Sequence, residues 1–138
     1  MRRYLVVANQ TLGGDHLLEE VRECLRTDAC RFHIVVPATE PRDHVVTSEG
    51  EARALAQGRL DLALARFREL GVDAEGEVGD ERPMDAIRDA LRDREFDGIV
   101  LSTLPPGISR WLGQDLPHRV EREFGLPVRH VIGTAEPA

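Results

Sequence analysis

The sequence predicts an α/β fold in which a parallel β-sheet is covered by helices on both faces. Short apolar segments alternate with longer segments of helical spacing, in the order β-α-β-α-β-α-β-α-β. Several of the apolar segments are almost continuous, which is typical of strands buried on both faces. The chain has 138 residues, the size of one ordinary domain, so we expect a single domain over residues 1–138.

The first strand is predicted at residues 4–8, where the sequence Tyr-Leu-Val-Val-Ala is short and apolar. Turn-forming residues at 9–14 end this strand. Apolar residues at helical spacing over 17–25 then predict the first helix. We expect Asp15 to cap its N-terminus.

The second strand is predicted at residues 32–36, and a polar stretch follows it at 38–47. Residues 48–51 read Ser-Glu-Gly-Glu, the pattern of a capping box at a helix start. The longest helix is predicted from there to residue 70, with Gly71 as its end. Its expected buried face consists of Ala52, Ala56, Leu60, Ala63, Phe67 and Leu70.

A weak third strand is predicted at residues 72–78, where apolar residues alternate with small and acidic ones. That pattern suits an edge strand. Pro83 fits the first turn of a third helix, whose apolar stripe covers residues 84–91. The clearest strand of the chain follows at 98–101.

The last elements are a loop rich in proline and glycine at 102–113, a helix at 116–124 and a strand at 127–132. Strict alternation of strands and helices requires right-handed crossovers and a parallel sheet. Ligands bind such sheets at the carboxyl ends of the strands, where the strand order reverses. The segments 9–14 and 102–113 are therefore the expected location of a binding site.

Composition excludes several classes of function. The net charge of -7 argues against nucleic-acid binding, and the absence of lysine argues against a P-loop or Schiff-base chemistry. No apolar run approaches the roughly 20 residues of a membrane span, and the N-terminus does not resemble a signal peptide, so we expect a cytoplasmic protein. Cys24 and Cys30 form neither a disulfide framework nor a zinc motif. The five histidines form no metal-binding cluster, and we expect His33 and His130 to be hydrogen-bonded groups at a sheet surface or interface.

Five phrases of the sequence together resemble the universal stress protein family over nearly the whole chain. They read RYLVVAN, FHIVVP, GEVGDERPMDAI, FDGIVLSTLPPGISRWLGQDLPHRV and GLPVRHVI. The resemblance implies a three-layer α/β/α sandwich of the adenine nucleotide alpha hydrolase-like type, with a five-stranded parallel sheet of order 3-2-1-4-5. It also implies a homodimer formed through the edge strand Val128–Ile132.

Nucleotide-binding members of that family carry a loop of the form G-x2-G-x9-G-(S/T), whose glycines let backbone N–H groups approach phosphates. Here Ser102 and Pro105 stand at the first two glycine positions, Gly113 at the third, and Gln114 at the Ser/Thr position. Pro105 and Pro106 also lack N–H donors. The sequence therefore predicts a degraded phosphate loop.

Asp115 adds to this expectation, because it precedes Leu-Pro and is expected to be the N-cap of the last helix. Its carboxylate would repel a phosphate by about 1–4 kcal/mol, which Arg110 and Arg119 would offset if they point inward. Trp111, the single tryptophan, is expected either to anchor this loop or to plug the phosphate region.

The sequence thus predicts a regulatory or stress-response module with weak or lost binding of AMP or ATP. One alternative is slow Mg-dependent ATP hydrolysis or adenylate transfer in the same cleft, with Asp15 or Asp115 holding the metal. Another is a ligand-free dimerisation module. We identify no catalytic residues and no resident metal ligands. The candidate site residues are Asn9, Val36, Ser102, Thr103, Gly107, Gly113 and Gln114.

Overall fold

The structure is a computed structural model that describes residues 1–39, 49–107 and 109–133. It contains five strands, β1 (Arg2–Val7), β2 (Cys30–Pro37), β3 (Asp73–Gly79), β4 (Gly98–Thr103) and β5 (Val128–Ile132). The helices are α1 (Asp15–Thr27), α2 (Glu49–Glu69), α3 (Pro83–Arg92), α4 (Arg110–Gly113) and α5 (Leu116–Phe124). The predicted elements are confirmed, and α4 is an additional short helix inside the predicted loop at 102–113.

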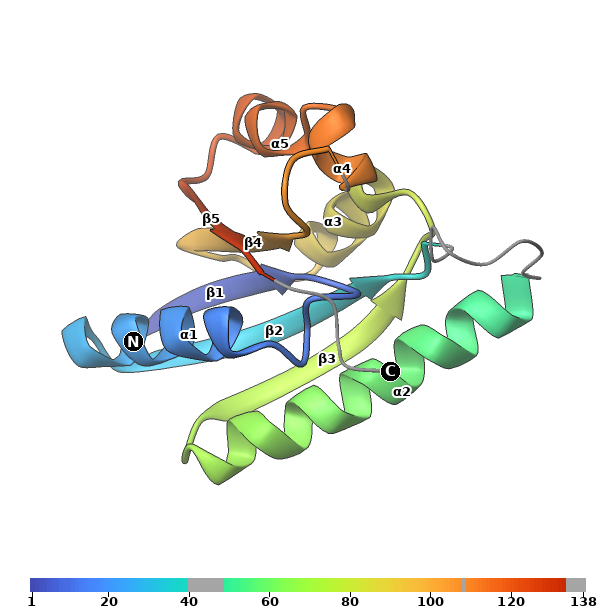
Figure 1. Ribbon diagram of the computed structural model, residues 1–138. Coiled ribbons are helices and arrows are strands. Elements are labelled where there is room, and N and C mark those ends of the chain that lie inside the picture. Colours follow the sequence, from blue (N-terminus) through green and yellow to red (C-terminus); the bar gives the residue numbers. More distant parts are fainter. Residues whose placement is uncertain (40–48, 108, 134–138) are drawn as a thin grey trace.

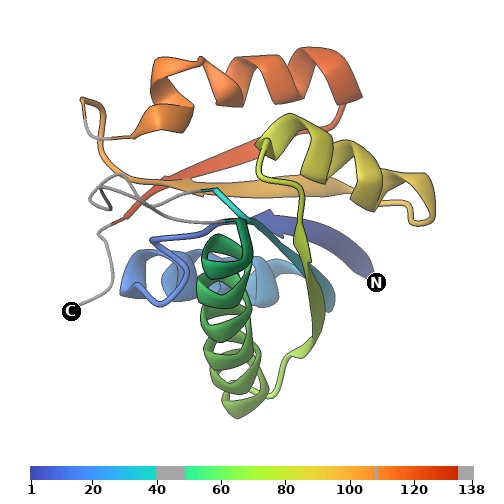
Figure 2. The same ribbon diagram turned by 90° about the vertical axis from the view of Figure 1, so that its right-hand side faces the viewer.

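The strands form one parallel sheet in the order β3-β2-β1-β4-β5, which confirms the predicted topology. Helices α1 and α2 cover one face of the sheet, and α3, α4 and α5 cover the other (Figures 1 and 2). The chain therefore forms three layers. The change of face between α2 and α3 places β1 and β4 side by side at the centre of the sheet.

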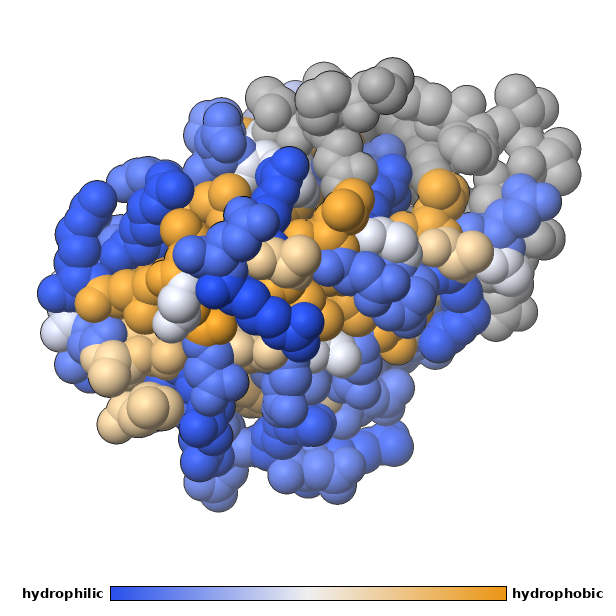
Figure 3. All heavy atoms as spheres, turned by 90° about the horizontal axis from the view of Figure 1, so that it is seen from below, coloured by the Kyte–Doolittle hydropathy of each residue, from blue (hydrophilic) through white to orange (hydrophobic). Residues whose placement is uncertain are grey.

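Each face of the sheet has its own apolar core, and β1 contributes to both. Leu5 and Val7 pack toward α3 and α5, whereas Val6 and Ala8 pack toward α1 and α2. This alternation explains the continuous apolar sequence of β1. On the α2 side, the predicted residues Ala52, Ala56, Leu60, Ala63 and Phe67 are buried, and Leu70 is partly buried. Apolar atoms remain visible between charged side chains on this face (Figure 3).

The helix ends differ in detail from the predictions. Gly71 ends α2 as expected, with a φ of +75° that favours glycine. The N-cap of α1 is Gly14 rather than Asp15, so the predicted cap by Asp15 is wrong. Asp15 lies in the first turn instead, where a negative charge still interacts favourably with the helix dipole. The predicted capping box begins at Ser48, which lies outside the described residues, as does most of the stretch 38–47.

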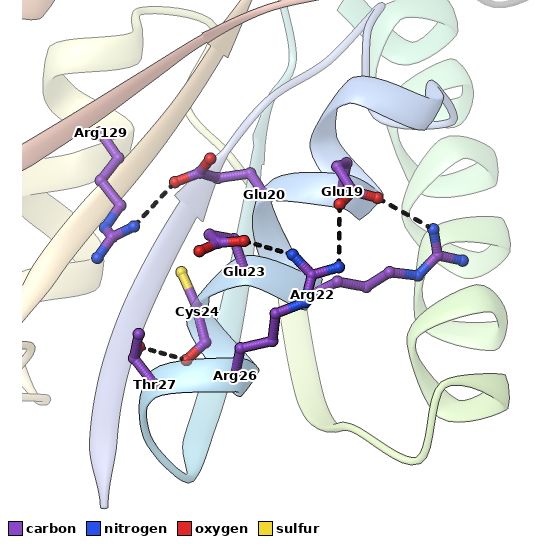
Figure 4. Close-up of polar contacts among 8 residues, drawn as sticks. All are labelled: Glu19, Glu20, Arg22, Glu23, Cys24, Arg26, Thr27 and Arg129. Carbon is purple, nitrogen blue, oxygen red and sulfur yellow. Dashed lines mark hydrogen bonds and ion pairs between the residues drawn. The ribbon is translucent and has the colours of Figure 1, made fainter.

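Charged side chains join the edge strand β5 to α1 on the neighbouring layer (Figure 4). A guanidinium nitrogen of Arg129 on β5 lies 3.1 Å from a carboxylate oxygen of Glu20 on α1, and the guanidinium lies over the ring of Tyr4. Along α1, Arg26 pairs with both Glu19 and Glu23. Each of these exposed ion pairs adds little to the free energy of unfolding, so we interpret them as contacts that position the elements.

The buried histidine of β2 has polar partners, and the two buried thiols show no sign of reactivity. His33 on β2 is buried, and its two ring nitrogens lie 3.3 Å from Glu75 and 3.2 Å from Glu77 on β3. Cys24 and Cys30 are free and buried, and burial raises the pKa of both thiols. Raised thiol pKa values argue against a reactive cysteine. No helix within the described part of the chain is long and apolar enough to cross a membrane.

Two glycines provide a matched test of this packing. A methyl group at Gly76 in β3 would lie 2.6 Å from Leu60 Cδ1 and 2.7 Å from the backbone oxygen of Ile34, whereas one at Gly58 in α2 would meet nothing within 4 Å. We expect Gly76→Ala to lower the free energy of unfolding by about 1–3 kcal/mol. We expect Gly58→Ala to raise it by about 0.5–1 kcal/mol. Urea unfolding measures both, and a change of the same sign in the two variants would contradict this packing.

Candidate functional site

The strand order reverses between the carboxyl ends of β1 and β4, a region that we call the crevice. The connection after β1 leads to α1 on one face, and the connection after β4 leads to α4 and α5 on the other (Figure 1). Four polar side chains lie at this crevice, and all are at least nine-tenths buried. They are Asn9, Thr11, Ser102 and Thr103.

Thr11 and Ser102 join the two sides of the crevice directly. Their hydroxyl oxygens lie 2.6 Å apart and are buried, so one hydroxyl donates to the other. Since each hydroxyl would otherwise lack a partner in a dry environment, this hydrogen bond holds the β1–α1 connection against the end of β4. Ser102 is therefore a structural link here, although it stands at the first position of the expected phosphate loop.

Asn9 is fully engaged by the chain itself. Its side-chain nitrogen donates to the backbone oxygen of Pro37 at 2.7 Å, and its side-chain oxygen accepts from Arg59 on α2 at 2.6 Å. Asn9 thus connects the ends of β1 and β2 to α2. The amide of this candidate site residue therefore already makes hydrogen bonds in both directions.

Thr103 pairs with the edge strand. Its hydroxyl lies 2.8 Å from Nε2 of His130 on β5, which supports the expectation that His130 is hydrogen-bonded. His130 keeps an exposed edge, but partial burial of the ring lowers its pKa from the ordinary value. Burial disfavours the charged imidazolium, so the neutral ring is favoured in the folded state.

The backbone between β4 and α5 uses several of its N–H groups internally. Gly107 turns the chain with a φ of +88°, and Pro105 and Pro106 have no N–H to offer. The N–H groups of Ser109, Gly113, Gln114 and Asp115 donate to backbone oxygens three or four residues earlier, at 3.0 to 3.2 Å. The N–H of Leu112 donates to the hydroxyl of Ser109 at 3.2 Å. A short helix therefore occupies the place where a cradle of open amides is needed to hold phosphate.

Asp115 is the N-cap of α5, as predicted, but it does not act as expected. Its backbone is left-handed, with a φ of 56°, and its carboxylate caps no N–H of the helix. The carboxylate instead lies 2.7 Å from Nδ1 of His118, one turn along α5. Since both side chains are exposed, the pair contributes little stability. The carboxylate therefore contacts His118 rather than the N–H groups at the start of the helix.

A cleft lies beside the crevice, between α3 and α5. It has a volume of about 750 Å³, within the range of small-molecule sites. Thr39 at the end of β2 and the turn before α3 form one wall, and α4 and α5 form the other. Its basic side chains are Arg82, Arg88, Arg119 and Arg122, and its acidic ones are Glu81, Asp85 and Glu123.

The seven predicted site residues fall into three groups. Asn9, Ser102 and Thr103 are buried at the crevice, and Val36 is buried in the core beside them. Gly107 and Gly113 lie in exposed parts of the 104–115 segment. Gln114 lines the cleft between α3 and α5, and Trp111 lines it too while packing into the core below.

The sequence predicts no group of arginines at this place and indicates, among the arginines of the cleft, only Arg119 as a cation beside the expected phosphate loop. Arg119 and Arg122 are three residues apart on α5, a spacing that places two side chains on one helix face. That spacing was available in the sequence, but the closeness of α3 and α5 was not. Within the described residues, no group of three or more His, Cys, Asp or Glu side chains is placed to hold a metal ion.

Comparison with solved structures identifies the fold. A universal stress protein from Archaeoglobus fulgidus matches with a TM-score of 0.64 and 17% identity, over 95% of this chain and 93% of that one. A universal stress family protein from Burkholderia pseudomallei matches with a TM-score of 0.61 and 18% identity, over 93% of each chain. A universal stress protein in complex with cAMP matches with a TM-score of 0.59 and 20% identity, over 96% and 98%.

These identities are low, so the likeness establishes the fold that the sequence resemblance implied, a universal stress protein fold. No protein-family model matches the sequence. No curated protein sequence matches it either.

The Thr11–Ser102 hydrogen bond can be tested with a double-mutant cycle. We expect Ser102→Ala alone to lower the free energy of unfolding by about 1–3 kcal/mol, because it leaves the Thr11 hydroxyl buried without a partner. Thr11→Val should cost a similar amount, and the double variant should cost less than the two single changes together. Additive effects in chemical denaturation would contradict a shared hydrogen bond.

His130 predicts a pH dependence of stability. Because burial lowers its folded-state pKa, the unfolded chain takes up this proton at a higher pH than the folded chain does. The contribution of neutral His130 to the free energy of unfolding is fully present above the ordinary pKa of 6.5 and is lost as the pH falls below that value. Denaturation of His130→Gln should therefore show a shallower loss of stability with acid than the parent protein. His16→Gln, at an exposed histidine, is the control, and equal slopes in the parent and in His130→Gln would count against this assignment.

Proposed function

We propose that this protein is a cytoplasmic, universal stress protein-like regulatory module that binds adenine nucleotides weakly or not at all at the crevice between β1 and β4. The observation that carries the proposal is the state of the backbone after β4. The N–H groups of Ser109, Gly113, Gln114 and Asp115 donate to backbone oxygens within this segment, and that of Leu112 donates to the Ser109 hydroxyl. Pro105 and Pro106 have no N–H to offer. Holding a triphosphate there would require several of these hydrogen bonds to break.

The state of the side chains at the crevice supports the same proposal. The Thr11 and Ser102 hydroxyls bind each other, and the Asn9 amide binds Pro37 and Arg59. An adenosine that bound these groups would have to replace existing buried hydrogen bonds, because the groups are not free donors or acceptors. Such an exchange gains little, because the net free energy of a hydrogen bond is small when another is lost.

One of the comparison structures is described as a complex with cAMP. We therefore include cyclic and linear monophosphates among the candidate nucleotides for this chain. A monophosphate needs fewer N–H donors than a triphosphate. Relative to a protein whose phosphate loop has open N–H groups, we therefore expect this chain to lose less affinity for AMP or cAMP than for ATP. Nothing in the described residues favours the alternative of ATP hydrolysis, since Asp115 is paired with His118 and Asp15 lies on the outside of α1.

We further propose that two copies associate through β5. The strand lies at the edge of the sheet, and Ile132 at its end is 44% exposed. Edge strands present unpaired backbone groups that can bind a second strand. A twofold dimer is also the commonest assembly of soluble proteins.

Thermal or chemical denaturation with added ligands tests the nucleotide proposal. We expect millimolar Mg-ATP to raise the free energy of unfolding by less than about 0.5 kcal/mol, the increment for a ligand present near its Kd. AMP and cAMP should raise it at least as much as ATP does. Purified protein should carry no stoichiometric absorbance at 260 nm.

Two results would contradict the proposal. One is ATP that copurifies with the protein or adds about 2.7 kcal/mol, the value for a hundredfold excess over Kd. The other is release of phosphate from ATP that disappears in Asp115→Ala, which would favour the hydrolase alternative. A variant with matched charge change at an exposed site, Asp61→Ala on α2, is the control for that assay.

A further inference from the structure

The cleft between α3 and α5 combines a volume suited to a small molecule with an excess of positive charge. Four arginines and three acidic residues line it, whereas the whole chain carries a net charge of -7. An acidic protein repels anions at long range, so an anion is expected to bind where the local net charge is positive. The cleft is the place within the described residues where that reversal coincides with a cavity of about 750 Å³.

One of the four arginines is already neutralised. Nη1 of Arg88 lies 2.7 Å from Asp85 on its own helix, and Nη2 lies 3.3 Å from Glu123 on α5. Arg88 also lies over the ring of Phe124. The contacts with Glu123 and Phe124 join α3 to α5 at the cleft, so we assign Arg88 a structural role.

The other three arginines are available. Among residues 1–39, 49–107 and 109–133, no ion pair involves the side chain of Arg82, Arg119 or Arg122, and all three are exposed. Arg82 comes from the turn before α3, whereas Arg119 and Arg122 come from one face of α5. They therefore approach the cleft from both walls, with Glu81 as the one lining carboxylate not engaged by Arg88.

We propose that this cleft binds a small organic phosphate whose phosphate group is held by the guanidinium groups of Arg82, Arg119 and Arg122. Guanidinium groups bind phosphate with paired, charge-assisted hydrogen bonds, so they can replace the amide cradle that this chain lacks. The remaining lining can bind the organic part. Gln114 and Glu81 offer hydrogen-bonding side chains to hydroxyls, and Met84 and Trp111 offer apolar surface. The Thr39 hydroxyl donates to the backbone oxygen of Glu81 at 2.9 Å and can still accept a hydrogen bond.

A phosphorylated sugar has this combination of a dianion with several hydroxyls, and we choose ribose 5-phosphate as the probe. This inference goes beyond the proposed function, because its cations lie outside the crevice and it requires no adenine. Gln114 is the one predicted nucleotide-site residue that lines the cleft. Binding in the cleft and binding at the crevice can therefore be tested separately.

Trp111 provides the readout. It is the single tryptophan of the chain, it lines the cleft and it is only 8% exposed, so a ligand in the cleft should change its fluorescence. Titration of the full chain with ribose 5-phosphate at low salt, followed by fluorescence and by calorimetry, should give saturable binding. Uncharged ribose should give none, and inorganic phosphate should bind more weakly than ribose 5-phosphate.

The variant R119Q/R122Q should weaken binding of ribose 5-phosphate at least about tenfold, the effect of losing one charged hydrogen bond of moderate strength. The matched control is R53Q/R68Q, which removes two exposed arginines from α2 on the other face of the sheet and should leave Kd unchanged. Unchanged melting temperatures would establish that both variants fold.

Several outcomes would overturn the inference: no binding of ribose 5-phosphate at millimolar concentration by either method, equal loss in R119Q/R122Q and R53Q/R68Q, or equal affinity for inorganic phosphate. If AMP binds but ribose 5-phosphate does not, this inference fails while the proposed function stands. If ribose 5-phosphate binds to the cleft and Mg-ATP binds tightly to R119Q/R122Q, the proposed function fails while this inference stands.

Discussion

A parallel sheet must be covered on both faces, and in this chain β1 is the strand whose side chains pack into the cores on both faces. Leu5 and Val7 pack on one face and Val6 and Ala8 on the other, so β1 connects the two cores. The neighbours of β1 follow from the connections. Helices α1 and α2 stay on one face while α3 and α5 take the opposite one, which places β4 next to β1 and makes their carboxyl ends the point where the strand order reverses.

The crevice and the cleft differ in how their polar groups are used. At the crevice, buried side chains bind each other, as Thr11 and Ser102 do at 2.6 Å. Between α3 and α5, Arg119 and Arg122 are exposed and line a cavity. A satisfied buried pair stabilises the fold but has little left to offer a ligand, whereas exposed guanidinium groups keep their hydrogen-bonding capacity. We therefore expect ligand recognition to lie on the helices rather than on the loop after β4.

The fold was predictable because its determinants are local. The apolar segments, Gly71 and the helical spacing in α2 each act within a few residues, and the sheet order followed from the resemblance to a known family. The cap of α1 was misassigned because Gly14 and Asp15 are adjacent and both are acceptable at such positions. The left-handed backbone at Asp115 was missed because residues other than glycine seldom adopt a positive φ. The contact of its carboxylate with His118 was missed as well.

The candidate site was less predictable, since its geometry depends on residues far apart in the sequence. The lack of N–H donors at Pro105 and Pro106 could be predicted from the sequence, but not the short helix that uses several of the other N–H groups. Likewise, the bond between Arg88 and Glu123 joins residues 35 positions apart, and it decides which arginines remain available. The sequence carries each of these residue types but not their distances.

Every basic side chain of the cleft is a guanidinium group, in a chain without a single lysine. Arginine stays protonated throughout the physiological pH range, and it is not a substrate for lysine acetylation. The positive charge of this cleft is therefore constant in the cell, independent of acidity and of acetyl-group supply. Ionic strength is the variable that remains to modulate its attraction for anions, through screening of the exposed charges.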